Sequence, residues 1–481
     1  MTFLGYEPDV ESRTAAMLRE EYGIFIDGRF VSGSQDRSVT VLEPSTSDPL
    51  ARVSVASAED VERAISSADQ ARRTSWGRLA GKERTKYLLR LSDLLQNRSR
   101  ELSALQAMES GRPIKMSRGT DLPLAVASLF HHAGWADKLE WAGAGTDPRP
   151  VGVVAQFPSH EHPVPSLVRA VAPALAAGNS VVLFPGETVP LSALVFAEIC
   201  HESGLPPGTV NVLPAPPELA TEVAQHPGVD KITFTGDLRR CRMMAESVAG
   251  RRAVLDLEVT GGGTAVLFDD APVDQAIEGI VRGVFLDRGP TTCPLSRLLV
   301  QETASRETIE RLRERIGRLR IDDPLDMNTD VGPLRTRSLL DKYTELVRSG
   351  EAEGAVRWTA SGALPGRGYW YSPTLFTEVA PVHRIARQAG SLPILSISTF
   401  RTPQEAVDEV NRSSHRGTAV IWTSKGSKAL WMSNRIQADT IWVNSTNIID
   451  PAMCPGTSVS TDLDVPASLR SILDYLRETG R

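Results

Sequence analysis

Residues 258–297 contain the side chains best suited to covalent catalysis. Glu258 lies just before a run of three glycines at 261–263, a helical pattern follows, and Cys293 comes after it, beside Pro294. A carboxylate on a glycine-rich turn and a thiol on the loop after a helix can converge as general base and nucleophile. The pattern therefore predicts an active-site arrangement.

The elements that would position these side chains alternate between strand and helix from Pro150 onward. The strand patterns are residues 151–156, 180–184, 209–213 and 231–235, with helical patterns between them. This alternation predicts right-handed crossovers and a doubly wound, Rossmann-type parallel sheet of the α/β class. Such sheets bind ligands at the carboxyl ends of their strands. A cofactor is therefore expected after Gln156, Phe184 and Thr235.

The residues before this alternation predict an arm, a hairpin and a helical layer. The first twenty or so residues are polar without a clear period, which predicts a loosely held arm. Residues 24–31 alternate around Asp27-Gly28, a hairpin signal in which glycine supplies the positive φ. Ser57, with Asp60 three residues later, predicts the N-cap of a helix.

Composition excludes several classes of partner. The net charge of −6 gives no reason to expect a nucleic-acid partner. The N-terminus has no basic segment or apolar core, and no apolar run reaches membrane-spanning length, which predicts a cytoplasmic protein without a membrane partner. The four cysteines are far apart and form no C-x-x-C pair, so neither a disulfide framework nor a metal site is expected.

Several collinear segments resemble the aldehyde dehydrogenase superfamily. They are AGWADK at 133–138, PALAAGNSVVLFPGE at 173–187, GLPPGTVNVL at 204–213, VDKITFTG at 229–236, GYWYSPTLF at 368–376 and TIWVN at 440–444. With the central stretch they cover the chain from about Phe25 to about Asn444. The resemblance implies NAD(P)-dependent oxidation of an aldehyde by a glutamate in E-L-G-G-K and a cysteine in G-Q-x-C-x-x-x-S-R.

The resemblance also implies a domain organisation. It places a nucleotide-binding-like domain at 20–260, interrupted by a shortened oligomerisation segment at about 139–149, and a catalytic-like α/β domain at 261–460. A helical tail is expected at 461–481, where many members end in a pairing strand. The shortened segment favours a dimer over the usual tetramer.

The catalytic motifs of the resembled family are altered in this chain. Glu258 stands at the general base, and the position 34 residues later, which belongs to the nucleophile, is Thr292. Cys293 is one residue beyond it. The oxyanion-binding asparagine of P-W-N-F-P aligns with Glu161. An anion about 4 Å from a developing oxyanion repels it by roughly 4 kcal/mol at an effective dielectric near 20.

Two other interpretations of the segment around Glu161 remain open. The carboxylate can simply be solvated at a strand end. His160 and His162 are a conceivable metal pair, although the sequence offers no further ligands for them.

The cofactor motifs are altered as well. The cofactor positions implied by the resemblance are Gln156, Phe184, Pro185, Glu187, Gly236 and Asp237. Phe184 replaces the lysine of K-P-S-E that binds the adenosine ribose. Asp237 puts negative charge where the family's helix N-terminus meets pyrophosphate, although it is a good N-cap. The nicotinamide-ribose clamp of E-E-x-F-G-P aligns with Ala389 and Ser391.

These coordinated changes lead to three hypotheses. The first is a catalytically degenerate member, a pseudoenzyme with a scaffold or regulatory role that pairs with an active paralogue or with itself. The second is an active enzyme that uses NAD or NADP with Cys293 and Glu258. The third is an enzyme that carries out different chemistry in the active-site cleft of the family, through Glu161, His160 or Glu258. A pocket lined by groups with perturbed pKa values around Glu258 would indicate such an enzyme. The substitutions favour the first and argue against NAD or NADP binding.

Overall fold

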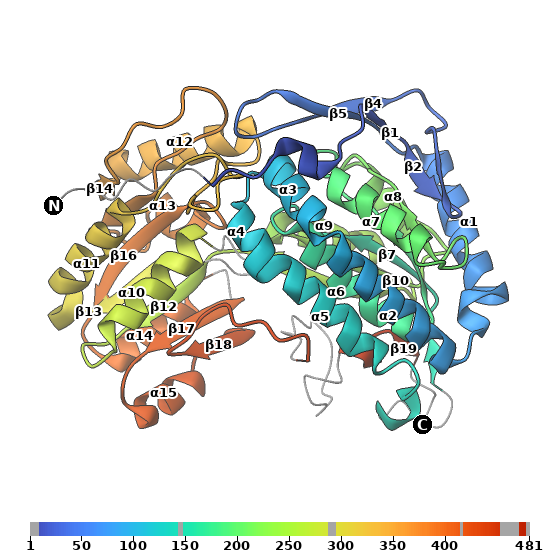
Figure 1. Ribbon diagram of the computed structural model, residues 1–481. Coiled ribbons are helices and arrows are strands. Elements are labelled where there is room, and N and C mark those ends of the chain that lie inside the picture. The colour runs from blue at the N-terminus through green and yellow to red at the C-terminus, as the bar shows by residue number, and fades with distance from the viewer. Residues whose placement is uncertain (1–8, 143–147, 287–294, 414–416, 453–470, 478–481) are drawn as a thin grey trace. The chain divides into compact units, whose positions relative to one another are not determined.

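The computed structural model describes residues 9–142, 148–286, 295–413, 417–452 and 471–477 (Figure 1). They divide into two compact units, a first unit of residues 9–258 with 449–477 and a second unit of residues 259–448. Thr292 and Cys293 lie outside the described residues. None of the described helices is long and apolar enough to cross a membrane.

The first unit contains three sheets and a layer of helices. Its strands are β1 (Glu21–Tyr22), β2 (Ile24–Ile26), β3 (Arg29–Val31), β4 (Ser38–Leu42), β5 (Pro49–Ser54), β6 (Arg149–Pro150), β7 (Val153–Phe157), β8 (Ser180–Leu183), β9 (Val210–Val212), β10 (Lys231–Asp237), β11 (Val254–Thr260), which runs on into the second unit, and β19 (Leu476–Arg477). Its helices are η1 (Arg13–Ala16), α1 (Ala58–Thr74), η2 (Trp76–Arg78), α2 (Gly81–Asn97), α3 (Ser99–Ser110), α4 (Ile114–Met116), η3 (Ser117–Asp121), α5 (Leu122–Ala133), η4 (Leu139–Ala142), α6 (Pro163–Ala176), α7 (Leu191–Glu202), α8 (Leu219–Gln225) and α9 (Leu238–Val248).

The main sheet of the first unit confirms the predicted doubly wound fold. Its seven strands run in the order β11-β10-β7-β8-β9-β2-β3, and β10, β7, β8 and β9 pair in parallel. Strands β8 and β9 extend the sheet on one side of β7, and β10 lies on the other side. The strand order therefore reverses between β7 and β10. The crevice at the carboxyl ends of β7 and β10 is therefore the switch point where such sheets bind ligands.

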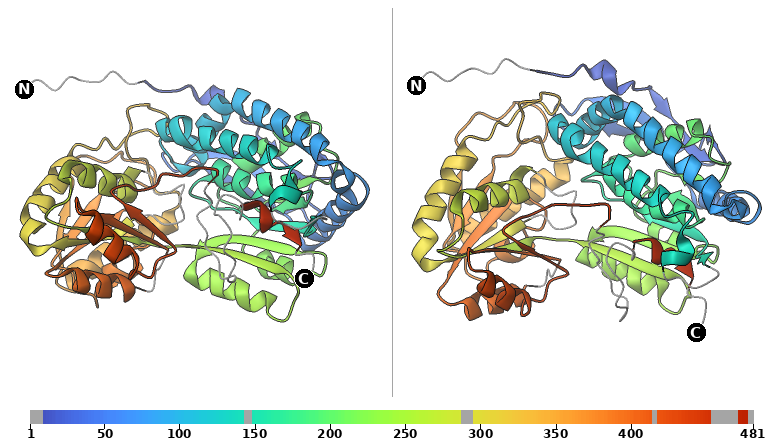
Figure 2. Two further views of the ribbon diagram at one scale, coloured as in Figure 1. Left: turned by 90° about the horizontal axis from the view of Figure 1, so that it is seen from below. Right: turned by 60° about the horizontal axis from the view of Figure 1, so that its bottom comes forward.

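Helices cover both faces of this sheet. Side chains from α1, α8 and α9 share a core with Val153, Ala155 and Val182, whereas α6 and α7 pack behind β8 and β9. Helices α2, α3 and α5 form an outer layer, with α5 packed on α6 (Figure 2). Successive strand residues alternate between these two faces, so both faces are apolar, as expected for a buried parallel sheet.

Local signals in the sequence explain two of these elements. Strands β2 and β3 form the predicted hairpin, and Asp27 (φ 54°) and Gly28 (φ 77°) make the two-residue turn with positive φ. Helix α1 begins with the predicted cap, in which Ser57 Oγ accepts a hydrogen bond from the Asp60 amide and Asp60 Oδ2 accepts one from the Ser57 amide at 3.0 Å. This reciprocal pair satisfies two donors at the start of the helix.

The prediction of a loosely held N-terminal arm is wrong for residues 9–20. Arg13 forms an ion pair with the buried carboxylate of Glu43, and η1 packs against α3. Glu11 is bound by two arginines, Arg100 and Arg118. These partners lie far away in sequence, so a local reading of the arm could not reveal them.

The predicted C-terminal helix ends earlier than expected within the described residues. Residues 471–473 are helical, but Leu476–Arg477 form β19, which pairs antiparallel with β6. The carbonyl of Tyr475 accepts hydrogen bonds from the Val151 amide at 3.1 Å and from Asn179 Nδ2 at 3.0 Å. After residue 473 the backbone therefore bonds to β6 and to the neighbouring residues Val151 and Asn179, and the helix does not continue.

The second unit is another α/β layer structure around a seven-stranded sheet. The strand order is β14-β15-β16-β13-β12-β17-β18, with β14 alone antiparallel to its neighbour. Its strands are β12 (Gly263–Leu267), β13 (Leu295–Gln301), β14 (Val356–Thr359), β15 (Thr374–Thr377), β16 (Ile394–Phe400), β17 (Thr418–Trp422) and β18 (Thr440–Val443). Its helices are α10 (Val273–Val281), η5 (Arg282–Leu286), η6 (Glu302–Ala304), α11 (Ser305–Gly317), α12 (Arg337–Ala352), α13 (Arg384–Gln388), α14 (Pro403–Asn411) and α15 (Gly426–Ser433). This confirms the predicted second α/β unit.

Candidate active site

Three aromatic side chains gather at the carboxyl ends of β7, β8 and β10. Phe157 and Phe234 are direct partners in the parallel register, and their ring centroids are 5.6 Å apart. Phe184 stacks on Phe157 at 5.1 Å and is only 3% exposed. This aromatic cluster of Phe157, Phe184 and Phe234 occupies the switch point of the sheet.

Gln156, which was predicted to face a cofactor, points the other way. It is buried, and its Nε2 donates to the Ser166 carbonyl in the first turn of α6 at 2.9 Å. Residues that follow one another in a strand point to opposite faces, so Phe157 lies on the face of the aromatic cluster and Gln156 on the face of α6. In this structure Gln156 ties β7 to α6.

The loop after β8 is held by contacts within the first unit. The Pro185 carbonyl accepts a hydrogen bond from the Ala215 amide at 3.1 Å. The imidazole of His160 lies so close to Gly186 that any side chain at that position would collide with it. Glu187 forms an ion pair with Arg37 at 3.1 Å, and partial burial raises the pKa of its carboxyl. The carboxylate that the resemblance assigns to the cofactor thus already has a cationic partner.

Asp237 forms the predicted N-cap of α9. Its Oδ1 accepts a hydrogen bond from the Arg240 amide at 2.9 Å. The Arg240 amide is one of the N–H groups in the first turn that lack a partner within the helix, and a phosphate bound at a helix N-terminus would use such groups. Gly236 precedes this cap, and the ring of Phe234 packs against its backbone. The start of α9 therefore carries an anion of its own.

Glu258 lies on β11 and is 6% exposed. Its Oε2 forms an ion pair with the guanidinium of Arg169 and accepts a hydrogen bond from Thr235 Oγ1 at 2.7 Å. Its other oxygen, Oε1, is buried and has no hydrogen-bond partner among the described residues. The thiol of Cys241 has the Gly236 carbonyl as its nearer acceptor at 3.4 Å and lies 3.8 Å from the Glu258 carbonyl, and burial raises the pKa of this thiol to about 11. Glu258 is thus held mainly through its side chain.

Arg169 was not among the site residues predicted from the sequence. A signal was nevertheless present, because Arg169 is the only charged residue of α6. A lone charge in an otherwise apolar helix usually has a dedicated partner. Nothing in the sequence pattern identified that partner as a carboxylate on a strand 89 residues later.

The turn that carries Glu161 rests on a buried polar cluster. The Glu161 amide donates to Ser159 Oγ at 3.2 Å. Beside it, the buried ring of His162 faces Asp121, with 3.9 Å between Nδ1 and Oδ1. Burial, together with the charge of Arg112, lowers the pKa of His162 to about 4. A neutral His162 is a structural core group in this arrangement.

Asp121 anchors that buried cluster. Arg112 donates to it through Nε at 2.5 Å and Nη2 at 2.9 Å, and Gln106 Nε2 donates at 2.6 Å. The charge of Arg112, together with the hydrogen bonds to the carboxylate, holds the pKa of the Asp121 carboxyl well below its usual range despite full burial. Paired and hydrogen-bonded in this way, the buried carboxylate stays ionised. Among the residues that the structure describes, no group of three or more histidine, cysteine or acidic side chains could hold a metal ion.

The aligned nicotinamide-ribose position in the second unit is apolar. Ala389 is the C-cap residue of α13 and is 2% exposed. Its carbonyl accepts a hydrogen bond from the Leu392 amide at 2.8 Å. Ala389 offers no side-chain acceptor for a ribose hydroxyl.

Comparison with known proteins gives consistent matches over most of the chain. The family model described as "Aldehyde dehydrogenase family" matches residues 30–459. "Retinal dehydrogenase 2" from Mus musculus is 32% identical over 440 residues, which is 89% of this chain and 85% of that protein. "Aldehyde dehydrogenase" from Agaricus bisporus is 30% identical, over 89% of this chain and 88% of that protein.

Solved structures give the same result for the fold. The NAD-dependent aldehyde dehydrogenase from Sinorhizobium meliloti superposes with a TM-score of 0.90 at 29% identity, covering 98% of this chain and 96% of that chain. The NAD⁺ complex of an aldehyde dehydrogenase from Bacillus cereus superposes with a TM-score of 0.90 at 26% identity, covering 98% of both chains.

Proposed function

This chain belongs to the aldehyde dehydrogenase family, and we propose that it is a catalytically degenerate member, a pseudoenzyme with a scaffold or regulatory role. Its partner would be an active aldehyde dehydrogenase paralogue or a second copy of itself. The observation that carries the proposal is the ion pair between Arg169 and Glu258, the residue at the general-base position. An ion pair with a guanidinium stabilises the anionic carboxylate, which weakens it as a proton acceptor.

The cofactor positions support the same proposal. The family implies NAD or NADP, and the relative from Bacillus cereus is described as an NAD⁺ complex. Here a buried phenylalanine, Phe184, replaces the lysine that would meet the adenosine ribose. Asp237 puts a carboxylate at the start of α9, where a phosphate at about 4 Å would be repelled by roughly 4 kcal/mol at an effective dielectric near 20. These residues do not fit the cofactor.

The nucleophile and oxyanion positions add two further arguments from the sequence. Thr292 stands at the nucleophile position, and a threonine hydroxyl without a strong base is a poor substitute for a thiolate. Glu161 stands where the family has a hydrogen-bond donor. Losing one such donor costs about 10²–10³ in rate, and an acceptor with negative charge is worse.

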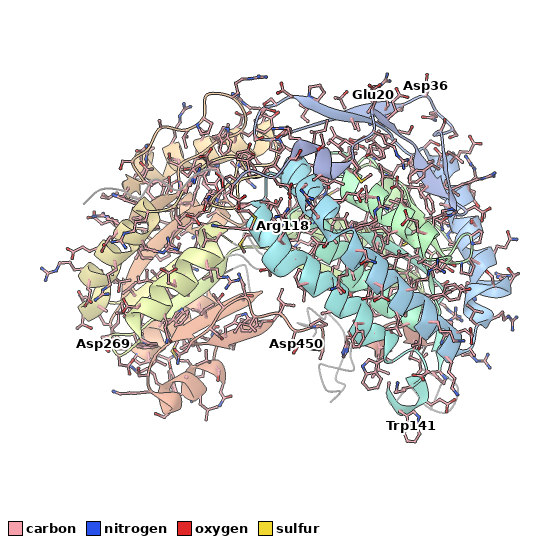
Figure 3. The ribbon with its side chains drawn as sticks, viewed as in Figure 1. Glu20, Asp36, Arg118, Trp141, Asp269 and Asp450 are labelled. Atoms are coloured by element: carbon pink, nitrogen blue, oxygen red, sulfur yellow. The ribbon has the colours of Figure 1, made fainter. Side chains whose placement is uncertain are left out.

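A role in protein association has support at the surface. Trp141, in η4, is 84% exposed, and it lies in the shortened oligomerisation segment at 139–149 (Figure 3). Aromatic side chains are enriched at protein interfaces relative to the rest of the surface. The proposed location is the cytoplasm, where thiols stay reduced, and Cys200 and Cys241 are free and buried.

An activity assay tests this proposal. The purified chain is incubated alone with NAD⁺ or NADP⁺ and with acetaldehyde, benzaldehyde or dodecanal, and reduced cofactor is followed by its absorbance. The expected result is no formation above a protein-free control, for the wild type and for Cys293→Ala alike. Turnover that is lost in Cys293→Ala and kept in Thr292→Ala would replace the proposal by an active enzyme with Cys293 and Glu258 as nucleophile and base.

A further inference from the structure

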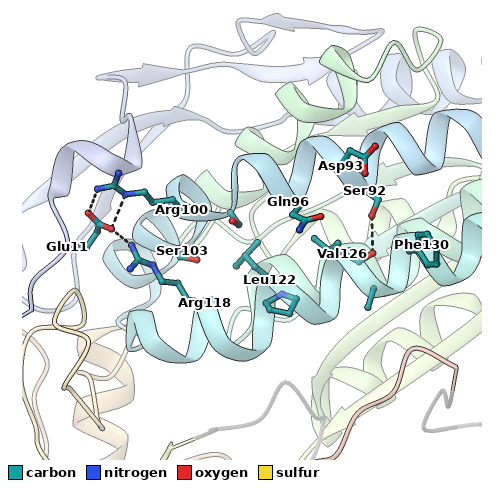
Figure 4. A pocket seen from close by; sticks show the side chains of 13 residues that line it. Glu11, Ser92, Asp93, Gln96, Arg100, Ser103, Arg118, Leu122, Val126 and Phe130 are labelled. Atoms are coloured by element: carbon teal, nitrogen blue, oxygen red, sulfur yellow. Dashed lines mark hydrogen bonds and ion pairs between the residues drawn. The ribbon is translucent and has the colours of Figure 1, made fainter.

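A groove of about 1020 Å³ lies in the first unit among α2, α3, η3 and α5 (Figure 4). None of its lining residues belongs to the candidate active site. Small-molecule sites usually measure about 300–1,000 Å³, so the groove has the size of a ligand site. The retained family motifs assign no role to it.

One end of the groove holds a carboxylate between two arginines. Arg100 donates to both oxygens of Glu11, through Nε at 3.1 Å and Nη2 at 2.9 Å, and Arg118 forms an ion pair with the same carboxylate. The Glu11 side chain is 8% exposed, and the hydrogen bond from Arg100 lowers the pKa of its carboxyl to about 2. Planar guanidinium groups that converge on one carboxylate form a geometrically specific anion site. Figure 4 shows both arginines directed at Glu11.

A buried hydroxyl lies in the same wall of the groove. Ser103 is fully buried, and its Oγ has no hydrogen-bond partner among the described residues. A buried polar group without a partner is uncommon, and at 0% exposure this hydroxyl is closed off from the open part of the groove. Ser103 comes from α3, as does Arg100, so the hydroxyl belongs to the same wall as the anion site.

The rest of the groove has an apolar stripe on one wall, formed by α5, and the polar side chains of Ser92, Asp93, Gln96 and Ser99 on the other. Leu122, Val126 and Phe130 line it at spacings of four residues along α5, in continuation of Arg118. Residues four apart share one helix face. The stripe from Arg118 to Phe130 extends roughly 18 Å at 1.5 Å per residue. Phe130 is 67% exposed at its far end.

We propose that this groove binds an organic carboxylate with a flexible apolar chain. The carboxylate head takes the place of Glu11 between Arg100 and Arg118, and the chain lies along Leu122, Val126 and Phe130. Glu11 is then a built-in competitor that occupies the head site when no ligand is present.

Calorimetric titration of the full-length chain with dodecanoate tests the proposal. Glu11→Gln should bind dodecanoate at least tenfold more tightly than the wild type, because the neutral amide competes poorly for two guanidinium groups. Glu20→Gln is the matched control on the same arm, and its affinity should equal that of the wild type. Adding Arg118→Gln to Glu11→Gln should lower the affinity at least tenfold.

Two further probes separate the head from the chain of the ligand. Acetate, which has the head alone, should bind at least tenfold more weakly than dodecanoate. Dodecyltrimethylammonium, which has a chain and the opposite charge, should not bind in the groove. Phe130→Ala, a change at an exposed site far from the arginines, should weaken dodecanoate binding several-fold without loss of the fold.

The outcomes that overturn the proposal are distinct. Equal affinity of Glu11→Gln and wild type, or no effect of Arg118→Gln, would exclude the arginine pair as the head site. Equal binding of acetate and dodecanoate, or binding of the cationic probe at the same site, would exclude the amphiphilic ligand. Should Glu11→Gln unfold, Arg100→Gln in the wild-type background carries the same test, and unchanged dodecanoate affinity there would also overturn it.

Discussion

Replacing Arg169 by methionine tests whether its guanidinium is the charge partner that the structure gives to Glu258. Methionine keeps most of the apolar stem and removes the charge. Opposite charges about 4 Å apart attract by roughly 4 kcal/mol at an effective dielectric near 20. Desolvation of the buried carboxylate offsets part of this, and the Arg169 side chain is 37% exposed, so water screens the pair further. The net loss of unfolding free energy expected for Arg169→Met is therefore about 2 kcal/mol.

A double-mutant cycle isolates this interaction from the packing of the arginine stem. Unfolding in urea is followed for Arg169→Met, Glu258→Gln and the double variant, with Arg239→Met as the control for loss of an exposed arginine in the same unit. The expected coupling energy is about 1–2 kcal/mol, and the control should change stability by less than about 0.5 kcal/mol. A coupling energy below about 0.5 kcal/mol would refute a stabilising ion pair between Arg169 and Glu258. The main structural support for the proposed loss of activity would then be gone.

Three other predictions concern the aromatic cluster, the cap of α9 and two buried histidines, His162 and His132 of α5. Phe184→Ala should lower the unfolding free energy by about 3–4 kcal/mol because the ring is buried in the aromatic cluster; a loss below about 1 kcal/mol in urea unfolding would show that Phe184 does not fill the cleft. Asp237→Ala should lower the unfolding free energy by about 1 kcal/mol, and Asp237→Asn should lower it much less, since asparagine also caps helices. Equal losses of stability in thermal melts of the two variants would contradict the role of Asp237 as a cap. His132 and His162 each have a pKa lowered to about 4 by burial, so the unfolded chain binds more protons than the folded chain between pH 6.5 and 4. The two histidines should therefore lower stability as the pH drops through this window, by up to roughly 3 kcal/mol each, while Glu109, whose pKa burial raises to about 7, acts in the opposite direction. The double histidine-to-asparagine variant should lose the histidine contribution, measured as its difference from the wild type in urea unfolding at pH 7 and pH 4.5.

Much of the fold could be predicted because its signals are local. Alternating strand and helix patterns located β7 to β10 and the helices between them, and the Asp27-Gly28 turn and the Ser57 cap appear where their residue types indicate. Both signals depend on neighbours within a few residues. The arm and the C-terminal segment were misread because their partners lie far away in sequence, as for β6 and β19.

Side-chain partners in the candidate site were harder to predict than the elements that carry them. Residue types alone identified Asp237 as a cap and Phe184 as a substitution at a cofactor position. Only the sheet register placed Phe157 and Phe234 side by side, and only the packing of α6 against the sheet brought Arg169 to Glu258. Side-chain partners of this kind depend on which face of a strand or helix each residue occupies, and that is fixed by tertiary packing.

Calorimetric titration of the purified wild-type chain with NAD⁺ and NADP⁺ into the millimolar range tests the loss of cofactor function most directly, because it requires no choice of aldehyde. Phe184, Asp237 and the Glu187–Arg37 pair together predict no saturable heat with either nucleotide. A saturating one-to-one isotherm with either would contradict that prediction and restore the chain to the cofactor-binding members of its family.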